Sequence, residues 1–519
     1  MIDGGVCAPV LILNAVQHVQ IAVSRSLHRR GVPVGVADIT GVATKPLSRS
    51  VQTFARLPNY IDTPERFAES LSRLIRDGRY DMLIPCSDPG LVAIAEHYER
   101  LRPLVYIGCP PPEVVRRVLD KKETLRIASE CGIATPATYN LSNLAALETL
   151  APRLRFPLIA KPASKIGETS QPFKMRYFAS LEGLREAFLI DPEFGANNLF
   201  QEYCEGEGVG IEVLLHRNEP IALFQHRRLK ELPASGGGSV ISESEALNAK
   251  LADQAITLLR RLEWQGVAMV EFRYDRANDK PVLMEVNGRY WGSLPLAIHA
   301  GIDFPFYEWQ LAHGRTPSVP ASYPVGLRAR WVSGDIRRLV SFFAEPSIEG
   351  YPTPSATAEI VRFVKDSILP ARPVLWSWSD PSPALHELGA VIKEALRPGK
   401  RRIERLRHMG MRDSAELLRL RALRAIGRGR DSPRMDLAGI RSVLFICHGN
   451  IIRSPMAEAL LRKYLANGMG RSLLDISSAG LIAHPDQCAD DRAKLVAMEF
   501  GVSLDDHKPR QLTREMLDQ

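Results

Sequence analysis

Long apolar runs are absent from this chain of 519 residues. No window reaches the roughly 20 apolar residues that a membrane-spanning helix needs, so we expect no segment that crosses a bilayer. The apolar stretch 8–16 is short and has no basic region before it. It is followed by His18 and Gln20 rather than by a cleavage site, so we expect no signal peptide. These absences make the cytoplasm the expected location.

The chain also lacks paired cysteines. Its seven cysteines are odd in number and scattered, and no two form a Cys-x-x-Cys pair, so neither a disulfide framework nor a zinc site is expected. Much of the formal net charge of +8 comes from the arginine-rich run 397–430, which lacks interleaved aromatic residues. This run is either a solvated basic helix or linker, or a contact for a polyanion or a membrane surface. We expect no nucleic-acid partner.

The composition that remains, with 45% hydrophobic and 24% charged residues, is typical of a folded globular protein, and the length predicts three or more compact domains. In residues 1–115, short apolar runs alternate with amphipathic helices, which predicts a Rossmann-like α/β domain with a parallel sheet. The Gly-x-Gly-x-x-Gly fingerprint is missing, so no dinucleotide is predicted. Strands are expected at 10–13, 34–37, 82–85 and 105–108, and helices at 19–30 and 66–76.

Residues 116–320 predict an α+β domain, because their apolar strands come in hairpin-like neighbours. Residues 321–439 predict an accessory region with proline-rich loops at 318–324 and 345–354, then a basic helical stretch over 381–430 and a linker at 432–437. Residues 440–519 begin a further α/β domain. The strands of the α+β domain are expected at 158–161, 199–203, 210–215, 220–225, 268–274 and 281–287.

The strand 281–287 carries alternating polar residues at its end. Side chains two apart on a strand share a face, so Glu285, Asn287 and Arg289 are expected to point together. With Glu271 they offer the carboxylate and amide oxygens that Mg²⁺ prefers, and Mn²⁺ is an alternative ion. Taken alone, the pattern is only suggestive, because the polar faces of half-exposed strands look similar.

Three features upstream of this strand are informative because of their order along the chain. Lys161 ends an apolar strand, where its ammonium can reach phosphate oxygens. The strand 199–203 runs into a polar hinge at Cys204 that suits adenine, and Glu207 follows for ribose hydroxyls. In this order the features resemble the ATP-grasp superfamily over residues 8–314, including the preceding Rossmann-like domain.

The resemblance assigns expected roles to individual residues. It implies ATP as cofactor with one or two Mg²⁺ ions, and a carboxylate that is phosphorylated and then attacked by an amine, both small molecules. A homodimer is a possible assembly. Arg289 would stabilise the transferring phosphoryl group or the acyl intermediate. The implied phosphate ligands are Lys121 and Lys161, the adenine ligands Gln201, Glu202, Tyr203 and Cys204, and the metal ligands Glu271, Glu285 and Asn287.

Two segments leave alternatives open. The stretch 225–233, which contains Lys230, and the glycines 236–238 form either a substrate or phosphate contact or an exposed charged hairpin. Tyr290 and Trp291 either shape the acceptor pocket or pack in the core. The loop 163–169 has a single glycine where many relatives are glycine-rich.

A second chemical motif starts at Cys447. An apolar strand at 443–446 leads into Cys447-x5-Arg453-Ser454 and then into a helix at 454–464. Successive N–H groups and a helix N-terminus favour a bound phosphate and lower the pKa of the thiol, which makes Cys447 a candidate nucleophile. Arg453 can grip two phosphate oxygens, and Ser454 can donate to the thiolate.

This motif, with the stretches 477–481 and 507–512, resembles the low-molecular-weight protein tyrosine phosphatases, which implies a phosphotyrosine protein as partner. Many members carry a second cysteine where Ile452 stands, so no protective disulfide is expected in the loop. In that family an Asp-Pro loop further along the chain supplies the general acid, and this sequence stops at Gln519, before such a loop. We therefore expect either a fragment or a phosphatase of low activity.

The leading hypothesis is an ATP-grasp ligase fused to a phosphatase-like domain. The first alternative is a phosphatase regulated by a nucleotide-sensing, non-catalytic ATP-grasp module. The second is a pair of non-catalytic binding scaffolds.

Overall fold

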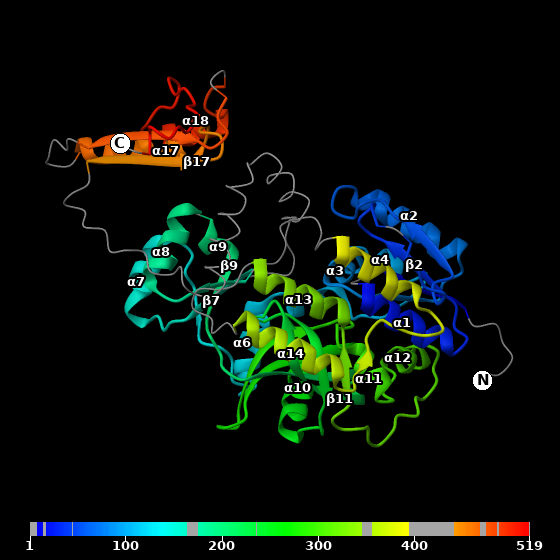
Figure 1. The fold of residues 1–519 in the computed structure, drawn as a ribbon. Coiled ribbons are helices and arrows are strands. Elements are labelled where there is room, and N and C mark those ends of the chain that lie inside the picture. Colours follow the sequence, from blue (N-terminus) through cyan, green and yellow to red (C-terminus); the bar gives the residue numbers. More distant parts are fainter. Residues whose placement is uncertain are drawn as a thin grey trace. The chain divides into compact units, whose positions relative to one another are not determined.

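The computed structural model describes residues 8–13, 17–43, 45–162, 175–191, 193–234, 236–344, 355–393, 441–467, 474–484 and 487–517. The chain divides into two compact units, Met1–Arg402 and Ile403–Gln519, which are described separately (Figure 1). Four predicted features lie outside the described residues. They are the loops 163–169 and 345–354, the linker 432–437 and the basic run 397–430.

The first unit opens with a five-stranded parallel sheet in the order β3-β2-β1-β4-β5. The predicted strands and helices are confirmed, whereas β3 was not predicted because its four residues are half-exposed and lack an apolar run. The strands are β1 Val10–Leu13, β2 Val34–Asp38, β3 Thr53–Arg56, β4 Met82–Pro85 and β5 Tyr106–Ile107. The helices are α1 Gln17–Arg29, α2 Pro64–Asp77, α3 Asp88–Glu96, α4 Tyr98–Leu101 and α5 Pro112–Leu119.

A four-stranded antiparallel sheet in the order β6-β9-β7-β8 follows, flanked by helices. Its strands are β6 Thr138–Tyr139, β7 Leu158–Pro162, β8 Arg176–Phe178 and β9 Asn198–Glu202. The helices of this part are α6 Lys121–Glu130, α7 Leu144–Leu150, α8 Leu181–Ile190 and α9 Phe194–Asn197.

A seven-stranded sheet in the order β14-β13-β10-β11-β12-β15-β16 completes the unit. Strands β15 and β16 extend this sheet past residue 320, the predicted domain boundary. The strands are β10 Glu207–His216, β11 Glu219–Leu232, β12 Gly238–Ser244, β13 Gly266–Asp275, β14 Lys280–Asn287, β15 Arg328–Arg330 and β16 Arg372–Pro373. The helices are α10 Ala249–Arg261, α11 Leu294–His299, α12 Phe304–Ala312, α13 Val332–Ala344 and α14 Ala356–Ile368, and a further helix spans 382–393.

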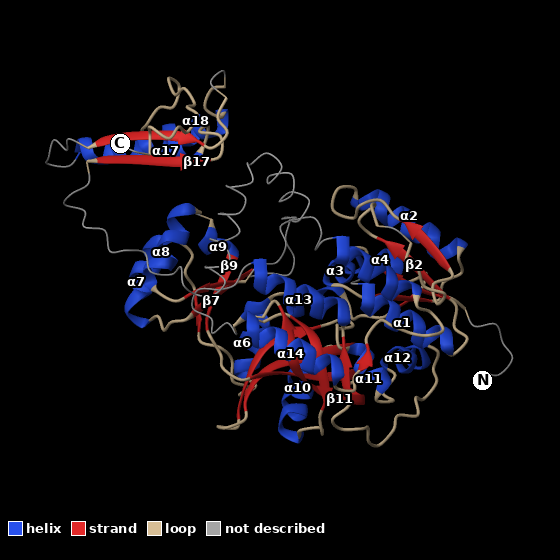
Figure 2. Ribbon diagram, viewed as in Figure 1, coloured by secondary structure: helices blue, strands red, loops and turns tan. Residues whose placement is uncertain are grey.

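One apolar core joins the parallel sheet to the seven-stranded sheet. Leu11 and Leu83 of the former cluster with Ile211 and Phe272 of the latter and with Trp264, which precedes β13. All five are at most 1% exposed. Helix α13 packs against the interior strands β11 and β12 of the seven-stranded sheet, and α14 packs against α13 (Figure 2).

The second unit contains two parallel strands, β17 Ser442–Cys447 and β18 Asp475–Gly480. Helix α17 spans Arg453–Asn467 and α18 spans Asp491–Glu499, so the predicted strand and helix around Cys447 are confirmed. Among the described helices of the chain, none is long and apolar enough to cross a membrane.

Candidate active sites

The polar residues at the end of β14 lie together, as the alternation of the strand requires. Asn287 Nδ2 donates to Glu285 Oε1 at 3.1 Å, and Arg289 Nη2 donates to Asn287 Oδ1 at 3.1 Å. Glu271 stands directly opposite Glu285 on β13, so its side chain shares their face of the sheet. Two carboxylates, an amide and a guanidinium therefore converge at this point.

Lys161 lies near these carboxylates at the end of β7 in the four-stranded sheet. Burial lowers the pKa of Lys161, and the carboxylates of Glu285 and Glu271 oppose this effect through their charge. Lys121 Nζ lies 3.5 Å from the carbonyl oxygen of Pro162, the residue after Lys161. The structure thus brings both predicted phosphate-binding lysines to one end of β7, with Lys161 within electrostatic range of the carboxylates.

Arg289 links this cluster to the parallel sheet. Its Nη2 lies 3.2 Å from Oδ2 of Asp88, which begins α3 directly after the end of β4. Burial alone would lower the pKa of Arg289, but Asp88, Glu285 and Glu271 raise it above the ordinary value. Asp88 was not predicted as a site residue, because no local pattern near residue 88 announces a partner 201 positions away.

The carboxylate of Glu271 is held by an arginine that the sequence pointed to only as part of the stretch 225–233. Arg228 on β11 donates from Nη1 to Oε1 at 2.6 Å and from Nη2 to Oε2 at 2.5 Å. Among the described residues, no group of three or more His, Cys, Asp or Glu side chains is arranged around a common metal position. The residues present fit Mg²⁺ only as Glu285, Asn287 and a shared Glu271, with the remaining oxygens supplied by phosphate and water.

The expected role of Lys230 is corrected by the structure. Its ammonium is buried and lies 3.0 Å from Asp335, 3.5 Å from Glu359 and 2.9 Å from Asp366, in an ion-pair cluster under α13 and α14. Irregularities in the β11–β12 pairing on both sides of Lys230 break the two-residue alternation, so Arg228 and Lys230 have different surroundings. The segment 225–232 is part of a long strand, and the glycines 236–238 form the turn into β12.

The residues expected around adenine differ in their contacts within the protein. Gln201 is buried and donates to Thr138 Oγ1 at 3.2 Å, and Glu202 accepts a short hydrogen bond from the Tyr139 hydroxyl. The N–H groups of Glu202 and Tyr203 donate to protein carbonyls at 3.0 Å, so they are engaged within the fold. Burial raises the pKa of the Cys204 thiol, and the charge of Lys161 opposes this shift, which places the hinge near the lysine.

The residue expected at the ribose is engaged elsewhere. Glu207 pairs with Arg276 at 2.8 Å and lies 3.7 Å from Arg227 at the edge of the sheet. Tyr290 and Trp291 are at most 1% exposed, and Trp291 packs against Phe304, so the structure supports core packing for both rings.

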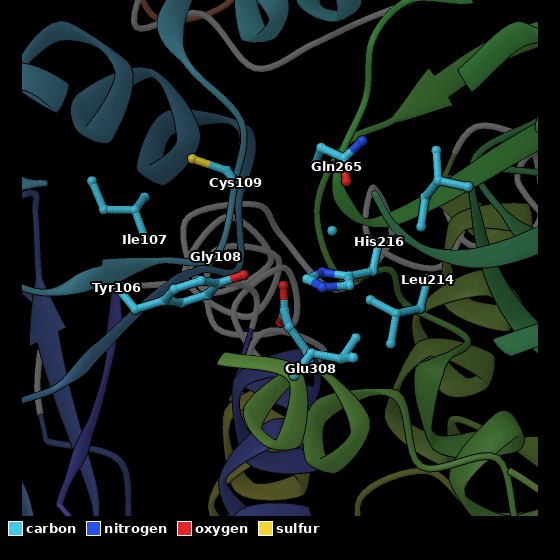
Figure 3. A pocket seen from close by; sticks show the side chains of 11 residues that line it. Tyr106, Ile107, Gly108, Cys109, Leu214, His216, Gln265 and Glu308 are labelled. Atoms are coloured by element: carbon cyan, nitrogen blue, oxygen red, sulfur yellow. The ribbon is translucent and has the colours of Figure 1, made fainter. Parts of the chain in front are cut away.

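A small cavity of about 40 Å³ lies between β5, the end of β10 and α12 (Figure 3). Its lining includes Tyr106, His216 and Gln265, and Glu308 faces it. Oε2 of Glu308 accepts from the Tyr290 hydroxyl at 2.6 Å, and burial raises the pKa of Glu308 to about 7. This cavity does not include Lys161, Glu285 or Asn287 in its lining, so it is separate from the candidate nucleotide site.

In the second unit the loop after β17 wraps the thiol of Cys447. Ser454 Oγ donates to Sγ at 2.9 Å and the Asn450 N–H donates at 3.2 Å. Burial would raise the pKa of Cys447, but the Ser454 hydroxyl and the N–H groups of Ser454, Asn450 and Gly449 together lower it below the ordinary value. Arg453 is exposed at the start of α17, beside this loop.

Asn450 organises the loop, and its role was not predicted. It has a left-handed φ of 53°, a conformation that asparagine tolerates better than most residues. Its buried amide donates at 2.9 Å to both Ser454 Oγ and Ser478 Oγ, and its Oδ1 accepts from the Arg510 N–H at 2.8 Å. These bonds explain why the stretches 477–481 and 507–512 accompany the cysteine motif.

Comparisons with known proteins found similar families for two stretches of the chain. Residues 196–334 match the family model described as ATP-grasp in the biosynthetic pathway with Ter operon, and residues 442–519 match low molecular weight phosphotyrosine protein phosphatase. The mitochondrial methylcrotonoyl-CoA carboxylase subunit alpha of Arabidopsis thaliana is 25% identical over 236 residues, which cover 42% of this chain and 31% of that protein.

The biotin carboxylase domain of the Hydrogenobacter thermophilus 2-oxoglutarate carboxylase, solved with MgADP, ADP and bicarbonate, has a similar fold. Its TM-score is 0.50 at 14% identity, over 63% of this chain and 74% of that one.

A low molecular weight protein-tyrosine-phosphatase of Escherichia coli is 47% identical over 75 residues, which cover 14% of this chain and 47% of that protein. The chain spans about half the length of the curated phosphatases it matches. It therefore joins a stretch with an ATP-grasp-like fold to a stretch that matches the low molecular weight phosphotyrosine protein phosphatases.

Proposed function

We propose that the first unit is an ATP- and Mg²⁺-dependent ligase that activates a small carboxylate for attack by an amine. One observation carries this proposal. Glu271, Glu285, Asn287 and Arg289 share one face of two adjacent strands, within electrostatic range of Lys161. An anionic oxygen cluster beside a buried ammonium suits a divalent ion together with a polyphosphate.

The chemistry follows from these charges. A carboxylate oxygen attacks the γ-phosphorus of ATP, the bond to the ADP oxygen breaks, and an acyl phosphate forms; the amine then attacks the carbonyl carbon, phosphate leaves and the amine loses a proton. Lys161 and Lys121 neutralise phosphate oxygens, and Arg289 stabilises the transferring group. Glu285, Asn287 and Glu271 would hold Mg²⁺, or Mn²⁺, which supplies a Lewis acid at the phosphate.

Release of ADP tests the proposal. The full chain with ATP, Mg²⁺ and a panel of amino acids should release ADP with at least one pair of substrates. Glu285→Ala and Asn287→Ala should each lower that rate by about 100-fold or more, since each removes an oxygen at the developing charge. Asp279→Ala, in the exposed turn between the same two strands, is the matched control and should leave turnover unchanged. Full turnover in Glu285→Ala would exclude the ligase.

We infer a second activity, hydrolysis of a phosphate monoester, at the Cys447 loop. The observation that supports it is the pair of donors, Ser454 Oγ and the Asn450 N–H, aimed at a thiol with a lowered pKa. The thiolate attacks phosphorus and forms an S–P bond while the ester oxygen leaves, and water then cleaves the S–P bond. A phosphotyrosine protein is the proposed substrate.

Hydrolysis of p-nitrophenyl phosphate tests the Cys447 loop without a general acid, because the leaving group of this substrate needs none. A burst of p-nitrophenol is expected from the full chain and should vanish in Cys447→Ser. Cys488→Ser is the control, since Cys488 is an exposed free cysteine of the same unit. If the wild-type chain gives no burst, the phosphatase proposal fails for this chain.

A further inference from the structure

Helix α14 presents its apolar residues outward. Ile360, Val361, Val364 and Ile368 are 42%, 63%, 52% and 79% exposed, and their successive spacings of one, three and four residues form a single stripe along the helix. A helix on the surface of a globular protein normally turns this stripe toward the core. Helix α14 does the opposite.

The inward face of α14 is held by charge instead. Glu359 is 1% exposed, accepts from Arg338 at 2.7 Å and lies 3.5 Å from the Lys230 ammonium. Asp366 lies 2.9 Å from the same ammonium, and the ring of Phe363 lies under the guanidinium of Arg330 at 4.9 Å. This buried cluster of ion pairs fixes the rotation of the helix, so the apolar stripe cannot turn inward without breaking it.

The acidic and basic residues of α14 lie on different faces of the helix. Its two acidic residues, Glu359 and Asp366, face the protein and pair with the inner cations. Lys365 and Arg362 are exposed, and Arg362 Nη2 also donates to the carbonyl oxygen of Leu229. The outer face is therefore apolar and positive. Such a face is complementary to a surface that is apolar and negative.

We propose that the outer face of α14 docks the protein onto an anionic phospholipid surface. Interfacial helices have this pattern, an apolar face with lysine and arginine at its margins, and they lie in the plane of the headgroups without crossing the bilayer. A second copy of the chain fits less well, because a twofold contact would bring Arg362 and Lys365 against their own copies.

Sedimentation with lipid vesicles tests this surface. The full chain should sediment with vesicles of equal phosphatidylglycerol and phosphatidylcholine, less at high salt, and not with phosphatidylcholine alone. Val364→Glu and Ile368→Glu should each lower the partition coefficient by about tenfold or more, because each replaces an inserted apolar group by an anion. Ile190→Glu, a change at a residue 75% exposed at the end of α8, is the matched control and should bind as the wild type does.

Three results would overturn the proposal. One is the absence of sedimentation with the anionic vesicles. Another is unchanged binding of Ile368→Glu, which would assign the attraction to other basic segments. The third is a concentration-dependent dimer, seen by light scattering, that Ile368→Glu abolishes, which would make the stripe a contact between two copies. Thermal unfolding of each variant, expected to match the wild type because the residues are exposed, checks that the fold is intact.

Discussion

The reactivity of Cys447 depends on single hydrogen bonds. Burial disfavours the thiolate, and the donors from Ser454, Asn450 and Gly449 outweigh that effect. Ser454→Ala removes the side-chain donor at 2.9 Å but leaves burial in place, so the pKa of the thiol should rise.

The expected result is that alkylation of Cys447 by iodoacetamide requires a higher pH in Ser454→Ala than in the wild type. A tenfold weaker acid has about a tenfold smaller thiolate fraction near neutral pH, and the thiolate is the form that reacts. Cys488 is exposed and provides the internal reference. A pH profile of Cys447 that does not move would show that the N–H groups alone stabilise the thiolate.

Glu308 gives a prediction for stability against pH. Burial raises its pKa from 4.5 to about 7 in the folded state, so between these values the folded protein binds a proton that the unfolded chain has released. The resulting stability is fully present below about pH 4.5 and is lost as the pH rises through about 7.

Glu308→Gln keeps the shape of the side chain and cannot ionise. The wild type should therefore lose stability relative to Glu308→Gln as the pH rises from 5 to 8. The difference between their unfolding free energies should change by about 3 kcal/mol at most, because one pKa unit corresponds to about 1.36 kcal/mol. Urea unfolding at the two pH values measures the difference. Parallel pH dependence in the two proteins would show that Glu308 is not the titrating group.

At the scale of elements, β11 takes part in two ion-pair clusters. One contains Arg228 with Glu231 and Glu271, and the other contains Lys230 with Asp335, Glu359 and Asp366. Arg228→Ala should destabilise the protein by about 3 to 5 kcal/mol, because it leaves the largely buried carboxylate of Glu271 without its bidentate partner, whereas Glu231 keeps its ion pair with Arg273. Arg227→Ala is the neighbouring control. Its side chain is 31% exposed, and its partner Glu243 keeps a second cation in Arg328, so a loss below about 1 kcal/mol is expected. Equal losses in urea unfolding would contradict the distinction.

The same strand shows which structural features the sequence could predict. The alternation on β14 was sufficient to bring Glu285, Asn287 and Arg289 together, because a regular strand repeats every two residues. On β11 the sequence offered either a substrate or phosphate contact or an exposed hairpin for the stretch that contains Lys230. The burial of Lys230 beside Asp335, Glu359 and Asp366 depends on the packing of α13 and α14, which no local pattern encodes. Likewise Asp88 reaches Arg289 only through the packing of two sheets, which no local pattern encodes.

At the scale of the whole molecule, two compact units carry two different candidate sites. A ligand that binds only the folded state of one unit stabilises that unit by RT ln(1 + [L]/Kd), about 2.7 kcal/mol at a hundredfold excess over Kd. Thermal unfolding of the full chain should therefore respond separately to ligands of each site. MgADP should raise the transition of the first unit, and vanadate or inorganic phosphate that of the second.

Single substitutions assign the two transitions. Asn287→Ala should abolish the response to MgADP and keep the response to phosphate, whereas Arg453→Ala should do the reverse, because each removes a ligand contact from one unit only. If either substitution abolished both responses, the two sites would be coupled and the units would not unfold independently. If MgADP raised the transition while no amino acid pair released ADP, the first unit would bind nucleotide without acting as a ligase, and the nucleotide-sensing alternative would take its place.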